Sequence, residues 1–149
     1  MASLPATAAA KASRADWKNA QRVLSEKEAA YDRYLKTVVE PIEDRLQAIE
    51  DDAGIPRMRG FNPQRKRYMD ANPRLYRDYH ASHEELDRLA EEISDATLVI
   101  LDTPAPDGAA LRWKLNHLLE MDNETLGIWS EDYSRGTIAD IDRILGAAS

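Results

Sequence analysis

Cysteine is absent from this chain of 149 residues, and its absence excludes several kinds of chemistry. Without a thiol the protein can form no disulfide bond, no thiolate zinc site and no cysteine nucleophile. Glycine-rich phosphate loops and the motifs of serine hydrolases and zinc proteases are also missing from the sequence. The sequence therefore predicts no catalytic residue, no metal site and no cofactor, and we expect no enzymatic activity.

Long hydrophobic runs are missing as well. No stretch approaches the roughly 20 consecutive apolar residues that a membrane-spanning helix needs. The alanine-rich start of the chain has no basic leader before an apolar run, and Pro5 interrupts it. A net charge of -7 disfavours general attraction to nucleic acid or to an anionic membrane. We therefore expect a cytoplasmic protein with no membrane contact.

What the chain does contain is the composition of a helical protein. Hydrophobic residues make up 43% and charged residues 32%, which suits helices with one buried and one solvated face. The length is sufficient for one domain with a core of its own, and no strand pattern is present. The sequence predicts an all-α fold with a flexible tail over residues 1–12 and a single helical domain over residues 13–149.

Two long segments carry heptad repeats. Over residues 13–51, with Ser13 as the expected cap and Ala53-Gly54 as the expected stop, the stripe is interrupted at Glu28. Pro41 predicts a kink or a break within it. Over residues 73–101, Asn72 is the expected cap, with a start at Ser82 as the alternative. The repeating apolar positions are Trp17, Leu24, Tyr31, Val38, Leu35, Ile42 and Ile49 in the first segment and Tyr79, Leu86, Ile93 and Ile100 in the second. Because neither stripe can stay in water, we predict a long antiparallel, coiled-coil-like helical hairpin.

Two shorter helices are predicted after the hairpin, over residues 109–121 and 130–146, and we expect them to pack on it. Their predicted core faces consist of Leu111, Leu115, Leu118 and Leu119, then Ile138, Ile141, Ile144 and Leu145. Gly136 is expected to weaken the last helix by about 1 kcal/mol relative to alanine. A polar linker over residues 121–127 separates the two helices.

The last third of the chain, residues 98–146, resembles a set of uncharacterised small helical proteins found in bacterial chromosomes and prophages. The residues that carry the resemblance are Thr103-Pro104-Ala105-Pro106, Leu111-Arg112-Trp113-Lys114-Leu115, Leu118-Leu119, Trp129-Ser130-x-x-Tyr133 and Asp140-x-x-Arg143-Ile144-Leu145. The resemblance implies a helical fold and a bacterial or phage origin. The set has no assigned activity, so no functional residue is carried over from it.

Arginine and lysine are concentrated between Pro56 and Tyr79, around the basic connector (residues 53–72) that joins the two long helices. Within the connector, Asn62-Pro63 could start a short helix that runs to about Asp70. Seven cationic against two acidic side chains give this segment a net charge of +5, which leaves -12 for the remainder. The predicted binding residues are Arg57, Arg59, Phe61, Arg65, Lys66, Arg67 and Tyr68. Arginines interleaved with aromatic rings suit phosphate contact and base stacking, and equally suit the carboxylates of an acidic protein surface. A solvated hairpin tip, partly neutralised by nearby acidic residues, is the third interpretation.

The histidines offer weaker candidate sites. His80, His83, Glu84 and Asp87 would share one side of a helix and could present ligands to a metal. However, the Glu-x-x-His pairs of dimetal carboxylate bundles are missing, so the sequence favours a structural role for His83. His117 has no nucleophile placed beside it by any motif, and we interpret it as a packed or surface residue.

Together these observations favour a non-enzymatic structural or adaptor protein that binds another protein through the basic connector. Self-association into a dimer is one version, because long amphipathic helices often complete their burial across a two-fold axis. Two alternatives are a nucleic-acid-associated accessory protein that uses the connector and an acidic phage-encoded inhibitor of a host enzyme. No small-molecule substrate is evident.

Overall fold

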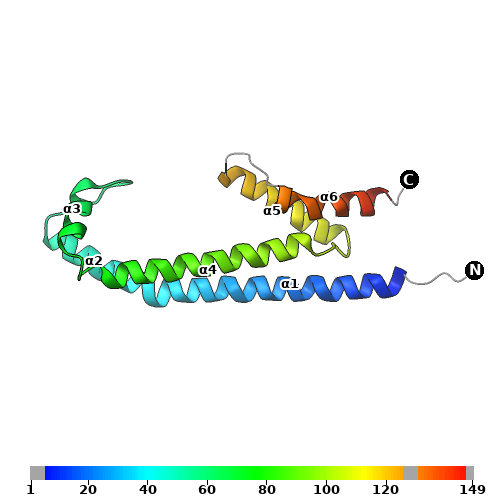
Figure 1. Cartoon of the computed structure of the whole chain (residues 1–149), viewed down its shortest axis with the longest axis horizontal. Coiled ribbons are helices and arrows are strands. Elements are labelled where there is room, and N and C mark those ends of the chain that lie inside the picture. The colour runs from blue at the N-terminus through cyan, green and yellow to red at the C-terminus, as the bar shows by residue number, and fades with distance from the viewer. Residues whose placement is uncertain (1–5, 126–130, 147–149) are drawn as a thin grey trace, which may run out of the picture. The chain divides into compact units, whose positions relative to one another are not determined.

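The structure, a computed structural model, describes residues 6–125 and 131–146, and within them all regular structure is helical (Figure 1). The all-α prediction is therefore confirmed. The elements are α1 (Ala6–Tyr34), the π-helix η1 (Leu35–Val39), α2 (Glu40–Asp52), α3 (Pro63–Ala71), α4 (Arg77–Asp102), α5 (Gly108–Thr125) and α6 (Glu131–Gly146). No helix in this described part of the chain is both long and apolar enough to cross a membrane.

The chain forms two compact units, one made of residues up to Lys27 and from Ile93 onward, the other of Glu28–Glu92. In the first unit the beginning of α1 packs against the end of α4, and α5 and α6 complete the core. In the second unit α2 lies beside the beginning of α4. Each unit taken by itself thus contains the antiparallel pairing that the heptads predict.

Helix α1 begins seven residues before the predicted cap at Ser13. The segment from Ala6 onward is rich in alanine, the residue with the highest helix propensity, so the helix extends into most of the predicted tail. Residues 1–5 of that tail lie outside the described residues, as do Trp129 and Ser130.

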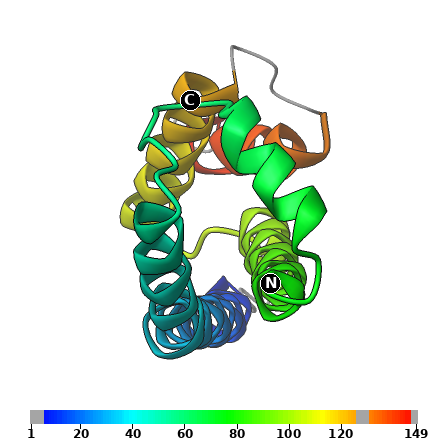
Figure 2. The same ribbon diagram turned by 90° about the vertical axis from the view of Figure 1, so that its left-hand side faces the viewer.

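The chain bends after α1, which is one of the two outcomes expected at Pro41. Over η1 the backbone widens to a π-helix, and the Glu40 N–H donates to the carbonyl oxygen of Leu35, five residues earlier. Proline lacks an N–H and clashes with the carbonyl four residues before it, which the wider turn relieves. Figure 2 shows this change of direction. The end of α1 is seen end-on, whereas α2 stands upright in the same view.

The wider turn also shifts the buried stripe by one residue. The heptad pattern predicts Val38 in the core, but Val38 is half-buried and Val39 is 1% exposed. Burial then continues at Leu46, seven residues after Val39. A π-turn holds one residue more than an α-turn, so every later residue moves to a neighbouring face.

The structure confirms the prediction at the first end of the connector and contradicts it at the second. Helix α2 stops as predicted at Ala53-Gly54, where Gly54 has φ 72° and the Ile55 N–H reaches back to the carbonyl oxygen of Glu50. The prediction that Asn72 caps the second long helix is wrong. Asn72 instead ends α3, its side-chain amide donating to the carbonyl oxygen of Tyr68, and α4 begins after a further turn, at Arg77.

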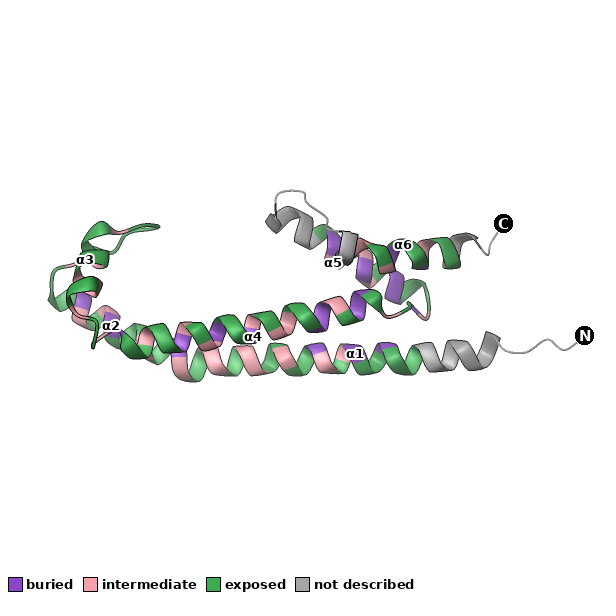
Figure 3. Cartoon of the chain, in the orientation of Figure 1, coloured by how far each residue is buried: buried purple, intermediate pink, exposed green. Residues whose placement is uncertain are grey.

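The first unit holds the main hydrophobic core. Its buried members are Trp17, Ala20, Leu24, Ala96, Ile100, Leu101, Ala105, Ala110, Leu111 and Leu118. Helix α5 starts directly after Asp107, whose carboxylate caps the Ala109 and Ala110 amides, and it extends to Thr125 through part of the predicted linker. Figure 3 shows how burial gathers where α4 and α5 meet.

The predicted core faces of α5 and α6 need correction at one position each. Leu119 is 53% exposed and Ile138 is 54% exposed, whereas Thr137 and Asp140 are buried. On α6 the cause is the close approach of this helix to the end of α4. At Gly136 a methyl group would overlap the carbonyl oxygen of Leu101, so only glycine fits there. This contact turns the face of α6 that carries Thr137 and Asp140 inward.

Candidate functional site

The connector is a loop followed by α3, and the side chain of Asn62 fixes the junction between the two. The loop joins the end of α2 to the start of α3, as Figure 2 shows. The predicted helix start at Asn62-Pro63 is confirmed, because the Asn62 Oδ1 accepts the amides of Gln64 (3.0 Å) and Arg65 (3.1 Å). The Asn62 side chain also donates to the carbonyl oxygen of Pro56 at 2.7 Å, which ties the loop to the helix.

A buried carboxylate holds α3 in place. Glu50, 2% exposed on α2, accepts the Tyr76 hydroxyl at 2.6 Å and the Arg65 Nε at 2.8 and 3.0 Å. Burial, reinforced by the hydrogen bond to Glu50, raises the pKa of Tyr76. Burial alone would lower the pKa of Arg65, but the hydrogen bond and the charge of Glu50 raise it. Arg65 is therefore an anchor of the fold, which the sequence prediction did not distinguish from the other arginines.

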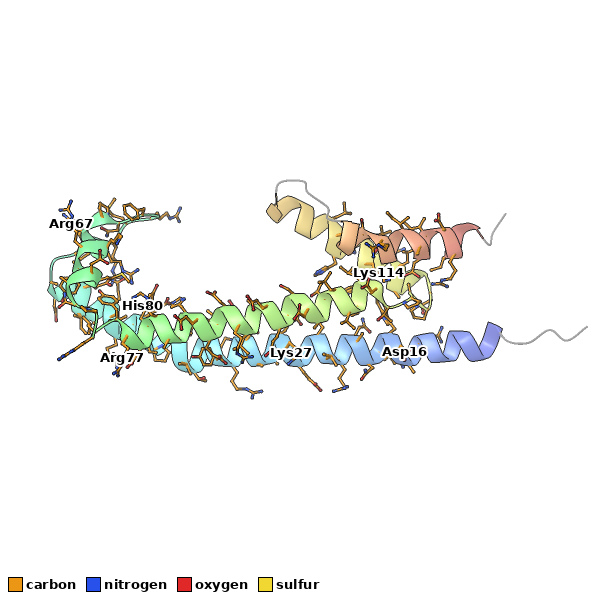
Figure 4. All side chains as sticks on the ribbon, in the orientation of Figure 1. Asp16, Lys27, Arg67, Arg77, His80 and Lys114 are labelled. Carbon is orange, nitrogen blue, oxygen red and sulfur yellow. The ribbon has the colours of Figure 1, made fainter. Side chains whose placement is uncertain are left out.

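The remaining cations of the connector, taken together with Arg74 in the turn that follows it, fall into two groups. Arg57 pairs with Asp51 at 2.5 Å and lowers the pKa of that carboxyl, and Lys66 pairs with Asp70 at 2.7 Å. Arg59, Arg67 and Arg74, in contrast, form no ion pair or hydrogen bond through their side chains with any residue that the structure describes. Figure 4 labels Arg67, which projects from α3. The free positive charge of the connector and of the turn after it belongs to these three arginines.

The aromatic residues of the connector also divide. Tyr68 is half-buried and meets the ring of Tyr76 edge to face, with centroids 6.4 Å apart. These two rings form a small core of the second unit, and Tyr68 is therefore a packing residue. Phe61 is 75% exposed and Met58 is 57% exposed. Gly60, with φ 82°, makes the turn between them. Two large apolar side chains thus stand in water beside an unpaired arginine.

A groove of about 710 Å³ runs between α2 and the connector. One wall is acidic and polar, and the other carries apolar side chains and cations. The lining residues are Glu43, Asp44, Gln47, Glu50, Pro56, Arg57, Met58, Gly60, Phe61, Asn62, Arg65, Lys66 and Met69. The groove cations Arg57, Arg65 and Lys66 each have a carboxylate partner, so its uncompensated charge is that of the acidic wall.

The histidines do not come together as a site. His83 lies 3.1 Å from a carboxylate oxygen of Glu43 and packs against the ring of Tyr79. His80 also contacts that ring, edge to face. In the described residues, no group of three or more His, Asp or Glu side chains is arranged to hold a metal ion. His117 stacks on Trp113 with centroids 5.0 Å apart, in agreement with a packed residue.

A second buried charge network lies in the first unit and was missed by the sequence reasoning. Lys114, 0% exposed, donates to a carboxylate oxygen of Asp140 at 2.5 Å and to the carbonyl oxygen of Leu101 at 2.7 Å (Figure 4). Asp140 also accepts the Ala105 amide and the Arg143 guanidinium. Burial would raise the pKa of Asp140, but these donors together lower it. Every polar partner is another residue of this unit, which makes the network structural.

No family model, curated protein or solved structure matches this chain. Its function is therefore inferred from the connector, the free charges that the connector carries and the groove beside it.

Proposed function

We propose that this chain is a non-enzymatic structural or adaptor protein of bacterial or phage origin that binds an acidic surface of another protein through its basic connector. The observation that carries the proposal is the free guanidinium groups of Arg59, Arg67 and Arg74, together with the exposed Met58 and Phe61 that flank Arg59 in the loop. Arginine and large apolar side chains are enriched at protein interfaces, where arginine pairs with carboxylates and aromatic rings fill pockets.

The rigid frame of the connector supports this interpretation. Arg65 and Tyr76 meet on buried Glu50, and Asn62 caps α3, so the three free arginines are displayed from an ordered backbone. A preordered surface loses less conformational entropy on binding than a disordered loop would.

Nucleic-acid binding is the alternative that the same arginines allow. The acidic wall of Glu43 and Asp44 beside the connector disfavours it, because phosphates approaching the loop would meet those carboxylates. The acidic-inhibitor alternative rests only on the charge of -12 outside the segment between Pro56 and Tyr79. Neither has an observation as direct as the free arginines.

The test compares partner capture by two charge-matched variants. The double variant Arg67→Glu, Arg74→Glu changes the free arginines and leaves the Glu50 anchor intact. Lys18→Glu, Arg112→Glu is the control, because both residues are exposed in the first unit and the charge change is the same. Each tagged protein is incubated with bacterial lysate, once with and once without nuclease treatment, and co-eluting proteins are quantified by mass spectrometry.

We expect wild type and control to retain a stoichiometric protein partner, and the connector variant to bind it at least about tenfold more weakly. Equal capture by all three proteins would remove the arginines from the binding surface. Loss of the captured material with nuclease, and affinity for a labelled duplex that falls linearly with the logarithm of salt concentration, would favour the nucleic-acid alternative.

A further inference from the structure

The groove and the loop beside it have complementary chemistry. On the groove side, Asp44 forms no ion pair with any described residue, and Glu43 is matched only by His83. On the loop side, Arg59 carries a free positive charge but is not one of the residues that line the groove, although its neighbours Met58 and Gly60 are. An acidic wall and an unpaired arginine thus coexist in one unit without meeting.

The groove also has apolar side chains that lack a covering partner. Met58 and Phe61 line the groove and are nevertheless more than half exposed, because nothing in the described part of the unit covers them. A segment that would fill the groove needs a cation to meet the acidic wall and a large apolar side chain to cover these two residues. The loop tip, with Arg59 between Met58 and Gly60-Phe61, is such a segment.

We infer that the occupant of the groove is the loop tip of a second copy of this chain. In a two-fold dimer, Arg59 of each copy pairs with Asp44 of the other, and the Phe61 rings cover each other's grooves. Two-fold contacts place the same patch on both subunits, so they require a patch that carries both halves of each pair. The inference rests on the proposed function, because both treat the connector as a protein-binding surface.

Charge-reversal complementation tests the pairing. Arg59→Glu and Asp44→Arg each place like charges opposite one another at both symmetric contacts. Mixing these two variants restores opposite charges at both contacts, because the introduced glutamate faces the introduced arginine and the native Arg59 faces the native Asp44. The swapped variant Asp44→Arg, Arg59→Glu restores them within a homodimer. Arg112→Glu is the control, and circular dichroism confirms that each variant is folded.

Association is measured by sedimentation equilibrium over a wide range of concentrations. We expect wild type and the control to dimerise, each single variant to dimerise about 100-fold more weakly, and the mixture and the swapped variant to recover dimerisation. The inference is overturned if wild type stays monomeric, if the single variants dimerise like wild type, or if the mixture stays monomeric. The proposed function would survive a monomeric wild type that still captures a partner through Arg67 and Arg74, so the two can fail separately.

Discussion

The two units bury charge in similar ways but place their apolar residues differently. The first unit holds Lys114 and Asp140 under a contiguous hydrophobic core that includes Trp17 and has Trp113 packed against it. The second unit holds Glu50, Arg65 and Tyr76 at the base of a connector that is largely exposed (Figure 3). A network under a core stabilises that core, whereas a network under an exposed loop fixes the shape of a surface.

The difference between the units is testable because they have different probes. All three tryptophans, at positions 17, 113 and 129, belong to the first unit by sequence. Tryptophan fluorescence therefore follows unfolding of the first unit, whereas hydrogen exchange of residues 63–76 follows the connector. A substitution in one network should alter one probe far more than the other.

The largest expected effect is that of Lys114→Met. Removing the ammonium leaves the buried carboxylate of Asp140 with fewer donors, and breaking one side of a buried ion pair typically costs about 3–5 kcal/mol. We expect the free energy of unfolding, measured by urea titration of tryptophan fluorescence, to fall by about that amount. Exchange in the connector should stay unchanged.

The double variant Lys114→Met, Asp140→Asn is the control for this prediction. Asparagine keeps an acceptor for the Ala105 amide and removes the buried carboxylate charge that the ammonium had compensated, so most of the lost stability should return. A loss below about 1 kcal/mol for the single variant would mean that the ammonium is dispensable to the first unit.

The second prediction concerns the connector anchor. Glu50→Gln removes the charge that Arg65 faces while it keeps an acceptor for the Tyr76 hydroxyl, and we expect a cost of about 1–3 kcal/mol. The amides of α3 should exchange faster, with the tryptophan transition unaltered. The control is Glu43→Gln, whose contact with His83 is exposed and should contribute under about 1 kcal/mol. If both variants changed the amide hydrogen exchange of α3 equally, Glu50 would be no more important to the connector than the surface residue Glu43.

Much of the fold could be predicted because its signals are local. The stop at Ala53-Gly54, the start at Asn62-Pro63 and the kink at Pro41 depend on residues that act within one turn of themselves. Asn72 shows the limit of such reasoning. The same Asn-Pro pattern that starts α3 occurs again at Asn72-Pro73, where Asn72 instead ends α3. Local chemistry allows both roles, and the position of Tyr76 over Glu50 decides between them.

The candidate site was predicted as a region, while the role of each residue in it was not. All seven predicted residues lie on the connector, but Arg65 is an anchor, Arg57 and Lys66 are paired, and Tyr68 packs in the small core. Lys114 is the clearest miss, since lysine is almost never fully buried without a partner and its partner lies 26 residues away. Distances of this kind are set by tertiary packing, which one sequence does not specify.

A third prediction compares two glycines of the first unit. At Gly136→Ala the new methyl group would overlap the backbone of Leu101, so α6 must move away from α4, and overpacking of this kind costs about 1–3 kcal/mol. At Gly108→Ala no atom lies within 4 Å, so we expect no loss and a gain of up to about 1 kcal/mol. Urea titration of tryptophan fluorescence measures both. Equal stability of the two variants would contradict the close approach of α6 to α4.

The smallest effect is the acid dependence of the first unit. The folded state lowers the pKa of Asp140, because Lys114, Arg143 and the Ala105 amide together outweigh the effect of burial. A lowered pKa contributes stability that is fully present above the unfolded value of about 3.9 and is lost as pH falls toward the folded value. The stability difference between wild type and Asp140→Asn, followed by tryptophan fluorescence, should therefore be constant near neutral pH and shrink below about pH 4. A difference that grows in acid would mean that the carboxyl is protonated in the folded protein, and the first unit would then lack the buried ion pair on which the comparison depends.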